Sequence, residues 1–213
     1  MVIELEDDKV PFYTQYVSVA IIVINVLVFL IQLLDPTGNM LIYEAAFIPR
    51  EFFEGKRYWT IITSMFMHGD FIHILFNMWF FFVVADNCEK AMGHVYFLIT
   101  YVVSGIVAAL LHALFTVLVP FMMDIPTLGA SGAIFGIIAV YGILFPKNKL
   151  GLLGSSRVRK ISAQQFILIY FVTEIIYAIV SLGASGTAHM AHVGGFIAGA
   201  FFAYLFKLFS KKY

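Results

Sequence analysis

Ser131 is the first residue of the sequence whose position indicates catalytic chemistry. It lies between Gly129 and Gly132 at the predicted start of a helix, where the first backbone N–H groups have no intrahelical acceptor. A serine hydroxyl becomes a nucleophile when a neighbouring base takes its proton, and a free backbone N–H can stabilise the oxyanion that forms. The pattern therefore indicates acyl transfer, although a small residue that eases helix packing has the same sequence signature.

His192 is the candidate base for this serine. Both residues are followed by a stripe of glycines, Gly132 and Gly136 after the serine and Gly195 and Gly199 after the histidine. Small residues four apart let two helix backbones approach closely, so we expect these helices to pack on their glycines and bring imidazole to hydroxyl. His189 lies nearly one turn nearer the surface, and for either histidine the alternative is a packing role.

A third polar stretch offers hydrogen-bond donors. His73 and Asn77 are four residues apart and share one helix face, so an imidazole N–H and an amide group point the same way. Two donors on one face suit an oxyanion. His68 precedes the predicted helix and could add a hydrogen bond or orient the loop. Hydrogen bonding that only holds helices together is the alternative.

The composition indicates a membrane protein. Hydrophobic residues make up 62% of the 213 residues and charged residues 12%, whereas soluble domains have about 45–50% and about 25%. The net charge is zero and basic residues flank apolar runs, which argues against a nucleic-acid partner. Cys88 is the single cysteine, which excludes an internal disulfide. The acidic leader does not fit a signal peptide, so we expect the first apolar run to be retained.

Six apolar runs could each cross a bilayer of about 30 Å as a helix. They cover residues 16–34, 71–85, 95–117, 129–145, 163–182 and 188–206, of which the second and fourth are short. A short run would extend into its flanks or be shielded from lipid by its neighbours. We therefore predict an all-α, polytopic six-transmembrane-helix bundle over residues 16–206, with an N-terminal segment over 1–15 and a basic tail over 207–213.

The distribution of Lys and Arg predicts cytoplasmic termini in the cell membrane. The inner segments would hold Lys9, Lys90, Lys147, Lys149, Arg157, Arg159, Lys160, Lys207, Lys211 and Lys212, and the outer segments only Arg50, Lys56 and Arg57. The three polar stretches then begin at similar depth below the outer surface, which predicts one site open toward the outside. Residues 35–69 mix aromatic and charged side chains, as expected for an amphipathic element in the outer interface. The inner loop, residues 146–162, contains Gly151, Gly154, Ser155 and Ser156 and is expected to be flexible.

The three stretches together resemble the rhomboid family of intramembrane serine proteases. They read His-x-x-x-x-His-x-x-x-Asn from His68 to Asn77, Gly-x-Ser-Gly at 129–132, and Ala-His-x-x-Gly-x-x-x-Gly at 191–199, in the family's order and spacing. The resemblance covers the whole six-helix core. It implies a Ser131–His192 dyad without an acid, with His73, Asn77 and the Ser131 backbone N–H holding the oxyanion. His68 and Gly129 are expected to help stabilise the oxyanion or the substrate.

Two positions depart from the family pattern. The family often has Trp-Arg in the first loop, whereas here Trp59 precedes Thr60 and only Arg57 is near, so a loop-anchoring arginine is not predicted. Many members have Tyr four residues after the serine, whereas this chain has Phe135, which can stack on a histidine but cannot donate a hydrogen bond. Glu89 and Gly93 match a polar turn of the family and are expected to be structural.

The resemblance implies how the site would act. His192 would deprotonate Ser131, which would attack a peptide carbonyl and form an acyl-enzyme that water hydrolyses. The partners would be the lipid bilayer and transmembrane protein substrates, whose helix must unwind before attack, and Gly or other helix-weakening residues near the cut would lower the cost of unwinding. The resemblance also implies a small residue such as Ala at the cleavage position. We expect no cofactor. The aromatic-rich run at residues 163–182 is the candidate lateral gate.

Other classes of membrane protein make weaker matches. A zinc protease would need His-Glu-x-x-His, which is absent, and Asp70 and Asp86 lie at opposite ends of a run, too far apart for an aspartyl pair. His189 and His192 could bind a metal only with further ligands, so no metal site is predicted. A catalytically silent rhomboid-like binding protein or a small transporter remains as an alternative, because Glu174 in the middle of a run would fit an ion path. A buried, protonated or hydrogen-bonded structural acid is the other interpretation of Glu174.

Overall fold

The structure is a computed structural model that describes residues 2–4, 10–11, 14–36, 40–153, 158–181 and 186–210. Helices make up most of this part of the chain. Five of them are long and apolar enough to cross a membrane: α1 (Tyr16–Leu33), α5 (Phe71–Met92), α6 (His94–Leu118), α8 (Ala163–Ser181) and α9 (His189–Phe209). The chain therefore has an all-α fold and is a multi-pass membrane protein. α7 (Ser131–Leu144) is apolar but shorter, so six crossings stay a prediction.

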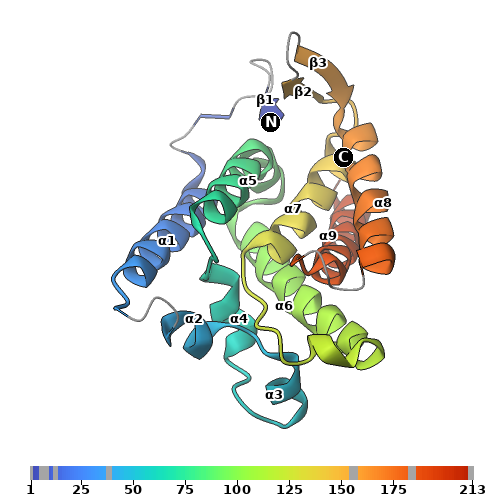
Figure 1. Cartoon of the computed structure of the whole chain (residues 1–213). Coiled ribbons are helices and arrows are strands. Elements are labelled where there is room, and N and C mark those ends of the chain that lie inside the picture. The colour runs from blue at the N-terminus through green and yellow to red at the C-terminus, as the bar shows by residue number, and fades with distance from the viewer. Residues whose placement is uncertain are drawn as a thin grey trace.

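The two short apolar runs behave differently. α5 continues to Met92 and ends at Gly93, whose φ of 77° stops the helix, so this run is long enough to span. α7 has 14 residues and a length of about 21 Å. All of its residues except Ser131 and Ile143 are buried, because α5, α6, α8 and α9 surround it (Figure 1). A helix shielded from lipid does not have to match the thickness of the hydrocarbon layer.

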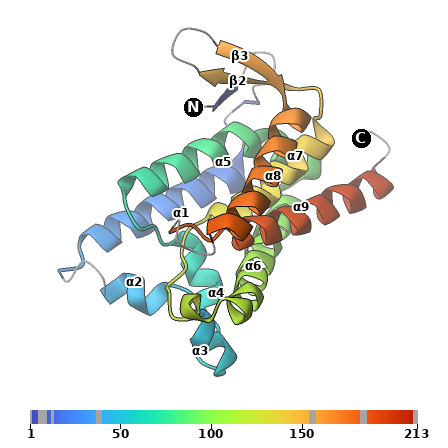
Figure 2. The ribbon, with the colours of Figure 1, turned by 45° about the vertical axis from the view of Figure 1, so that its right-hand side comes forward.

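α7 and α9 lie side by side in both ribbon views (Figure 1, Figure 2) and touch along their glycines. A Cβ atom added to Gly195 would overlap the carbonyl oxygen of Gly132, and one added to Gly199 would overlap the carbonyl oxygen of Gly136. Only hydrogen atoms fit at these two points of α9. The glycine stripes therefore set the separation between the two helices.

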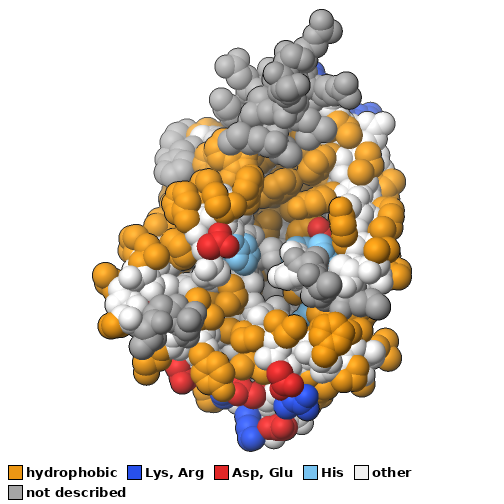
Figure 3. All heavy atoms as spheres, viewed as in Figure 1, with side chains coloured by type: hydrophobic (Ala, Val, Ile, Leu, Met, Phe, Trp, Pro, Cys, Tyr) orange, Lys and Arg blue, Asp and Glu red, His pale blue; other side chains and the backbone are white. Residues whose placement is uncertain are grey.

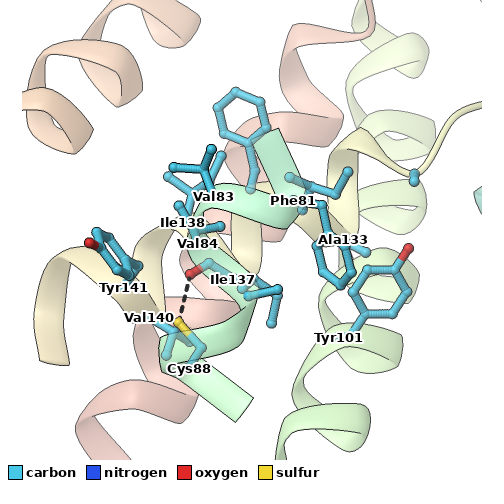
Figure 4. Close-up of a cluster of buried hydrophobic side chains, with 14 of the residues drawn as sticks. Phe81, Val83, Val84, Cys88, Tyr101, Ala133, Ile137, Ile138, Val140 and Tyr141 are labelled. Atoms are coloured by element: carbon cyan, nitrogen blue, oxygen red, sulfur yellow. Dashed lines mark hydrogen bonds between the residues drawn. The ribbon is translucent and has the colours of Figure 1, made fainter. Parts of the chain in front are cut away.

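On its other side α7 packs against α5 and α6 in the hydrophobic core. Figure 4 shows Phe81 and Cys88 of α5, Ile137 of α7 and Tyr101 of α6 in this cluster. The Cys88 side chain is fully buried, and its Sγ lies 3.7 Å from the carbonyl oxygen of Ile137. Close packing on every side holds α7 at a fixed height in the bundle.

The N-terminus of α1 is capped by a carboxylate from the end of α5. Glu89 is fully buried and accepts hydrogen bonds at 2.8 Å from the backbone N–H groups of Val17 and Ser18, and at 2.6 Å from the Ser18 hydroxyl. These N–H groups lie in the first turn of α1 and have no intrahelical acceptor. His94 approaches the same carboxylate at 2.6 Å. The contacts give Glu89 the structural role expected of it.

A small antiparallel sheet lies at the end of the molecule opposite α2 to α4 (Figure 1, Figure 2). It consists of β1 (Val2–Glu4), β2 (Lys149–Leu153) and β3 (Val158–Ser162) in the order β1-β2-β3. The prediction of a flexible inner loop was therefore wrong for residues 149–153 and 158–162. The pairing of Ile3 with Gly151 joins segments far apart in the chain, which no local pattern reveals. Gly154, Ser155 and Ser156 lie outside the described residues, as do Lys9, Arg157, Lys211 and Lys212 of the charge comparison.

The connection between α1 and α5 contains short helices instead of one amphipathic element. They are α2 (Met40–Ala45), α3 (Pro49–Phe53), α4 (Thr60–Thr63) and a 3₁₀ turn η3 (Ser64–Phe66). Arg57 holds this loop together, because its guanidinium donates to the Glu51 carboxylate at 2.8 Å and to the Tyr43 carbonyl. The chain thus has a loop-anchoring arginine, although Thr60 follows Trp59. A backbone bridge between Phe47 and Thr127 ties the loop to the segment before α7.

Candidate active site

Ser131 and His192 meet where α7 and α9 begin to run together. Ser131 is the first residue of α7, and His192 lies one turn into α9. The Ser131 Oγ and the His192 Nε2 are 2.8 Å apart, a hydrogen-bonding distance. The glycine contacts explain this approach, because Gly132 and Gly195 adjoin the two functional residues and let their backbones touch. The pair has the geometry of a serine nucleophile and its base.

The His192 ring is held in its plane by Phe135. The two rings are stacked with centroids 4.2 Å apart and an interplanar angle of 7°. Phe135 lies one turn after Ser131 on α7, so the residue that supports the imidazole comes from the same helix as the hydroxyl. Its other neighbour is Tyr170 of α8, at 5.0 Å between centroids. Phe135 thus orients the imidazole without a hydrogen bond.

The second nitrogen of His192 faces an acid. The His192 Nδ1 lies 2.8 Å from Oε2 of Glu174, and the same oxygen lies 2.7 Å from Nδ1 of His189. The resemblance implied a dyad without an acid, and the structure differs at this point. The sequence shows Glu174 as an acid inside a span and leaves an ion path and a buried structural acid as its alternatives. Only the packing of α8 against α9 brings it to His192.

The candidate oxyanion donors lie across the cavity on α5. The N-cap residue Asp70 accepts the His73 backbone N–H at 2.8 Å, which fixes the start of the helix. The Gly69 backbone N–H approaches the His73 Nδ1 at 3.3 Å. A nitrogen that accepts this bond carries no proton, so the proton resides on Nε2 and can be donated into the cavity.

Asn77 and the start of α7 complete the donor set. The Asn77 Nδ2 donates one proton to the His73 carbonyl at 3.0 Å, and a primary amide retains a second proton. The Ser131 backbone N–H belongs to the first turn of α7 and has no intrahelical acceptor. The side chains of His73, Asn77, Ser131 and His192 line the same cavity. The structure thus brings together four of the predicted site residues.

His68 does not contact this cavity directly. Its side chain is fully buried and packs edge-on against His73, with centroids 5.1 Å apart. Gln32 of α1 holds its backbone, accepting the His68 N–H at 3.0 Å and donating to its carbonyl at 2.9 Å. Burial lowers the pKa of His68 to about 4, so the ring is neutral at pH 7. Of the two roles considered, the structure supports orientation of the loop.

Gly129 also differs from its predicted role. Its backbone N–H donates to the Ser64 carbonyl at 2.9 Å, so this group is not available to an oxyanion. Its φ of 121° is a conformation that residues other than glycine rarely adopt. An added Cβ would also come within 2.8 Å of the His73 Nε2. Gly129 therefore lets the chain pass close to His73 and turn into α7.

The site opens into a cavity of about 850 Å³ between α5, α7, α8 and α9. Figure 3 shows this hollow with histidine side chains on both sides and apolar side chains around it. His73 and Asn77 of α5, Ser131 of α7 and His192 of α9 all line this cavity. The volume is in the range of sites that enclose small ligands or a few residues of a peptide.

Glu174, His189 and His192 also form a group that could ligate a metal, since their ligand atoms lie within 4.8 Å of one another. Sequence reasoning had only the two histidines, and the structure adds the carboxylate. Both imidazoles hydrogen-bond directly to Oε2, at 2.7 and 2.8 Å. One carboxylate oxygen therefore accepts a hydrogen bond from each of the two imidazoles and orients both rings.

A multi-pass helical protein whose serine and histidine meet in a cavity between apolar helices has the site of a serine-type hydrolase. A family model of the rhomboid domain matches residues 55–209. The chain belongs to the rhomboid family, as the three motifs predicted.

Individual relatives agree with this assignment. The chain is 29% identical over 209 residues to Rhomboid protease AarA of Providencia stuartii, which covers 92% of this chain and 74% of that protein. It is 27% identical over 211 residues to Rhomboid-like protein 15 of Arabidopsis thaliana, covering 95% of this chain and 48% of that protein. It is 28% identical over 165 residues to Rhomboid-like protease 3 of Toxoplasma gondii, covering 76% of this chain and 56% of that protein. The chain thus spans about three quarters of the first relative and about half of the other two.

Proposed function

We propose that this protein is an intramembrane serine endopeptidase that hydrolyses peptide bonds in or near transmembrane segments of other membrane proteins. The observation that carries the proposal is the 2.8 Å contact between Ser131 Oγ and His192 Nε2 in a cavity bordered by membrane-spanning helices. Relatives named rhomboid proteases support the same activity.

The proposed reaction has two steps. His192 takes the hydroxyl proton as the Ser131 Oγ attacks the carbonyl carbon, and the carbonyl oxygen becomes an oxyanion. His73, Asn77 and the Ser131 backbone N–H donate to that oxyanion. His192 then gives its proton to the leaving amine, which leaves an acyl-enzyme. Water, deprotonated by His192, attacks the ester and releases the acid, and the proton returns to Ser131.

The substrate of the proposed enzyme is a transmembrane helix. A peptide carbonyl inside a helix is hydrogen-bonded and shielded, so the helix must unwind locally before Ser131 can reach it. Residues of low helix propensity near the scissile bond reduce the cost of unwinding. The likeness to the family implies a small residue such as Ala at the cleavage position.

We place the site toward the outer face of the cell membrane, with both termini in the cytoplasm. The starts of α5, α7 and α9, which carry the site, lie on the side of the connection between α1 and α5, and the sheet lies at the opposite end (Figure 2). Lys147, Lys149 and Lys160 belong to the sheet end, as the excess of basic residues on the cytoplasmic side requires.

The test uses two variants and a model transmembrane substrate in detergent. Ser131→Ala and His192→Ala should each lower the cleavage rate by several orders of magnitude, because they remove the nucleophile and the base. Ser181→Ala is a matched control, since that residue is partly exposed, does not line the cavity and donates its hydroxyl proton to the carbonyl one turn earlier, at 2.6 Å. Full cleavage by both active-site variants refutes the proposal.

A fluorophosphonate probe, which reacts with an activated serine, distinguishes the proposed protease from a silent binding protein or a transporter. Labelling that disappears in Ser131→Ala supports the protease, whereas a silent binding protein leaves the probe unreacted. A transporter would instead show cation flux in proteoliposomes that depends on Glu174.

A further inference from the structure

Glu174 is a buried acid that neither the proposed reaction nor the family motifs use. It lies in the middle of α8 with 5% of its surface exposed. Its Oε2 faces the His192 Nδ1 at 2.8 Å, on the opposite edge of the imidazole from Ser131. Three groups are therefore connected in series: the Glu174 carboxylate of α8, the His192 imidazole of α9 and the Ser131 hydroxyl of α7.

This arrangement determines the tautomer of the base. An ionised carboxylate has no proton to donate, so the hydrogen bond requires a proton on the His192 Nδ1. In neutral imidazole the lone pair then lies on Nε2, which faces the Ser131 Oγ at 2.8 Å. The other tautomer would present an N–H to the serine and could not accept its proton.

The carboxylate also favours the charge that forms during the reaction. When His192 accepts the serine proton, both of its ring nitrogens are protonated and the ring carries a positive charge. A negative carboxylate in contact with its Nδ1 stabilises that cation relative to the neutral ring, and a site shielded from water strengthens the interaction.

His189 holds the carboxylate in position. Its Nδ1 donates to the same Oε2 at 2.7 Å, and its ring stacks on Tyr177 of α8 with centroids 5.3 Å apart. Two donors on one oxygen limit rotation of the Glu174 side chain. A buried carboxylate is also costly without such partners.

We propose that Glu174 is a positioning residue that converts the Ser131–His192 pair into a Ser131–His192–Glu174 triad, with His189 fixing the carboxylate. The inference rests on the proposed function. Glu174 acts through His192 and makes no contact with the substrate.

The experiment compares Glu174→Gln, Glu174→Asp and Thr173→Val in the full-length protein. Glutamine keeps the size but loses the charge, and aspartate keeps the charge on a shorter side chain. Thr173 is partly exposed on the same helix and donates to the Ile169 carbonyl at 2.8 Å, so Thr173→Val controls for changes in α8 itself. The readouts are kcat and KM for a model transmembrane substrate, the rate of fluorophosphonate labelling, and Tm.

Glu174→Gln should lower kcat by about 10²–10⁴-fold with KM changed by less than about 3-fold, in line with removal of the acid in other serine protease triads. Glu174→Asp should recover part of kcat, and Thr173→Val should match the wild type. Labelling by the small probe should slow in parallel with kcat, because the probe reacts with Ser131 only when His192 activates it. The probe does not need α8 to move, so this slowing cannot come from a change in substrate entry. The wild type should also show a strongly deshielded Nδ1–H proton resonance that Glu174→Gln abolishes.

Several outcomes overturn the inference. They are a kcat of Glu174→Gln within about 3-fold of the wild type, a change confined to KM, a loss of activity that only follows a fall in Tm, or cleavage that a metal chelator abolishes. If Ser131→Ala is inactive and Glu174→Gln is fully active, the triad fails and the proposed function stands. If Ser131→Ala keeps full activity, both fail.

Discussion

The proposed oxyanion donors on α5 are individual side chains whose contributions can be measured. His73 presents Nε2 to the cavity, and Asn77 retains one amide proton after its bond to the His73 carbonyl. Removing one donor from an oxyanion hole typically lowers kcat by about 10²–10³-fold. We expect His73→Ala and Asn77→Ala each to lower kcat within this range, with a smaller change in KM, when cleavage of a model transmembrane substrate is measured.

Asn25 provides a matched control for Asn77. Its amide makes the same bond to the carbonyl one turn earlier, at 2.8 Å, but Asn25 is buried in α1 and does not line the cavity. Asn25→Ala should therefore affect Tm more than kcat. An equal loss of kcat in Asn25→Ala and Asn77→Ala would contradict the oxyanion role.

The neutral ring of His68 predicts a pH dependence of stability. Burial lowers its pKa from 6.5 to about 4 in the folded state, so between these values the unfolded state binds more protons. The free energy of unfolding should then fall as the pH is lowered from 6.5 toward 4. Above pH 6.5 the contribution of His68 to that free energy should not change with pH. Tm measured across the window should fall more in the wild type than in His68→Phe, whereas parallel curves would exclude the contribution of His68.

Single residues show how far sequence reasoning reached. Glycine spacing and helical periodicity are local properties, and they were enough to select Ser131, His192, His73 and Asn77, which line one cavity in the structure. The contact of Glu174 with His192 was missed, since the sequence neighbours of Glu174 are apolar and do not show that α8 packs against α9.

The glycine contacts between α7 and α9 set how close these two helices lie. A methyl group on Gly195 would overlap the Gly132 carbonyl, so the helices must separate, and with them Ser131 and His192. We expect Gly195→Ala to lower both kcat and the free energy of unfolding, the latter by about 1–3 kcal/mol. Thermal unfolding and cleavage assays measure the two effects. Ala200→Val adds more volume at a partly exposed position of α9 and should change neither greatly. Wild-type kcat in Gly195→Ala would contradict the close contact.

α8 is the element that we propose as the lateral gate. It is the least buried of the five long helices, with 22% of its most apolar window buried. It meets α5 through aromatic rings, including Phe80 against Phe166 with centroids 5.8 Å apart. These ring contacts can separate on the α5 side while the hydrogen bonds that Glu174 accepts keep α8 on α9.

A reducible thiol cross-linker between Phe80→Cys and Phe166→Cys tests the gate. Locking the two helices should abolish cleavage of a transmembrane substrate but leave fluorophosphonate labelling of Ser131 unchanged, and reduction should restore cleavage. Unchanged cleavage in the locked protein would show that substrate enters elsewhere. The single cysteine of the wild type, Cys88, is fully buried and should not interfere.

At the scale of the whole molecule, the number of crossings decides where the termini lie. If α7 crosses together with the five long helices, both termini lie on the same side, whereas five crossings alone would separate them. We expect tags at both termini to be degraded by protease in inside-out vesicles and protected in right-side-out vesicles. Protection of only one tag in either preparation would refute six crossings.

Composition and hydrophobic pattern by themselves determined that the chain is a helical membrane protein, because solvation by lipid requires long apolar helices whatever their arrangement. The motifs also predicted the family, which the comparisons confirmed. Tertiary structure alone decided that α7 is enclosed, that residues 2–4 complete a sheet, and that Glu174 reaches His192. The reason is physical: these features depend on contacts between segments far apart in the chain, and hydropathy reports only whether a residue avoids water, not which neighbour replaces it.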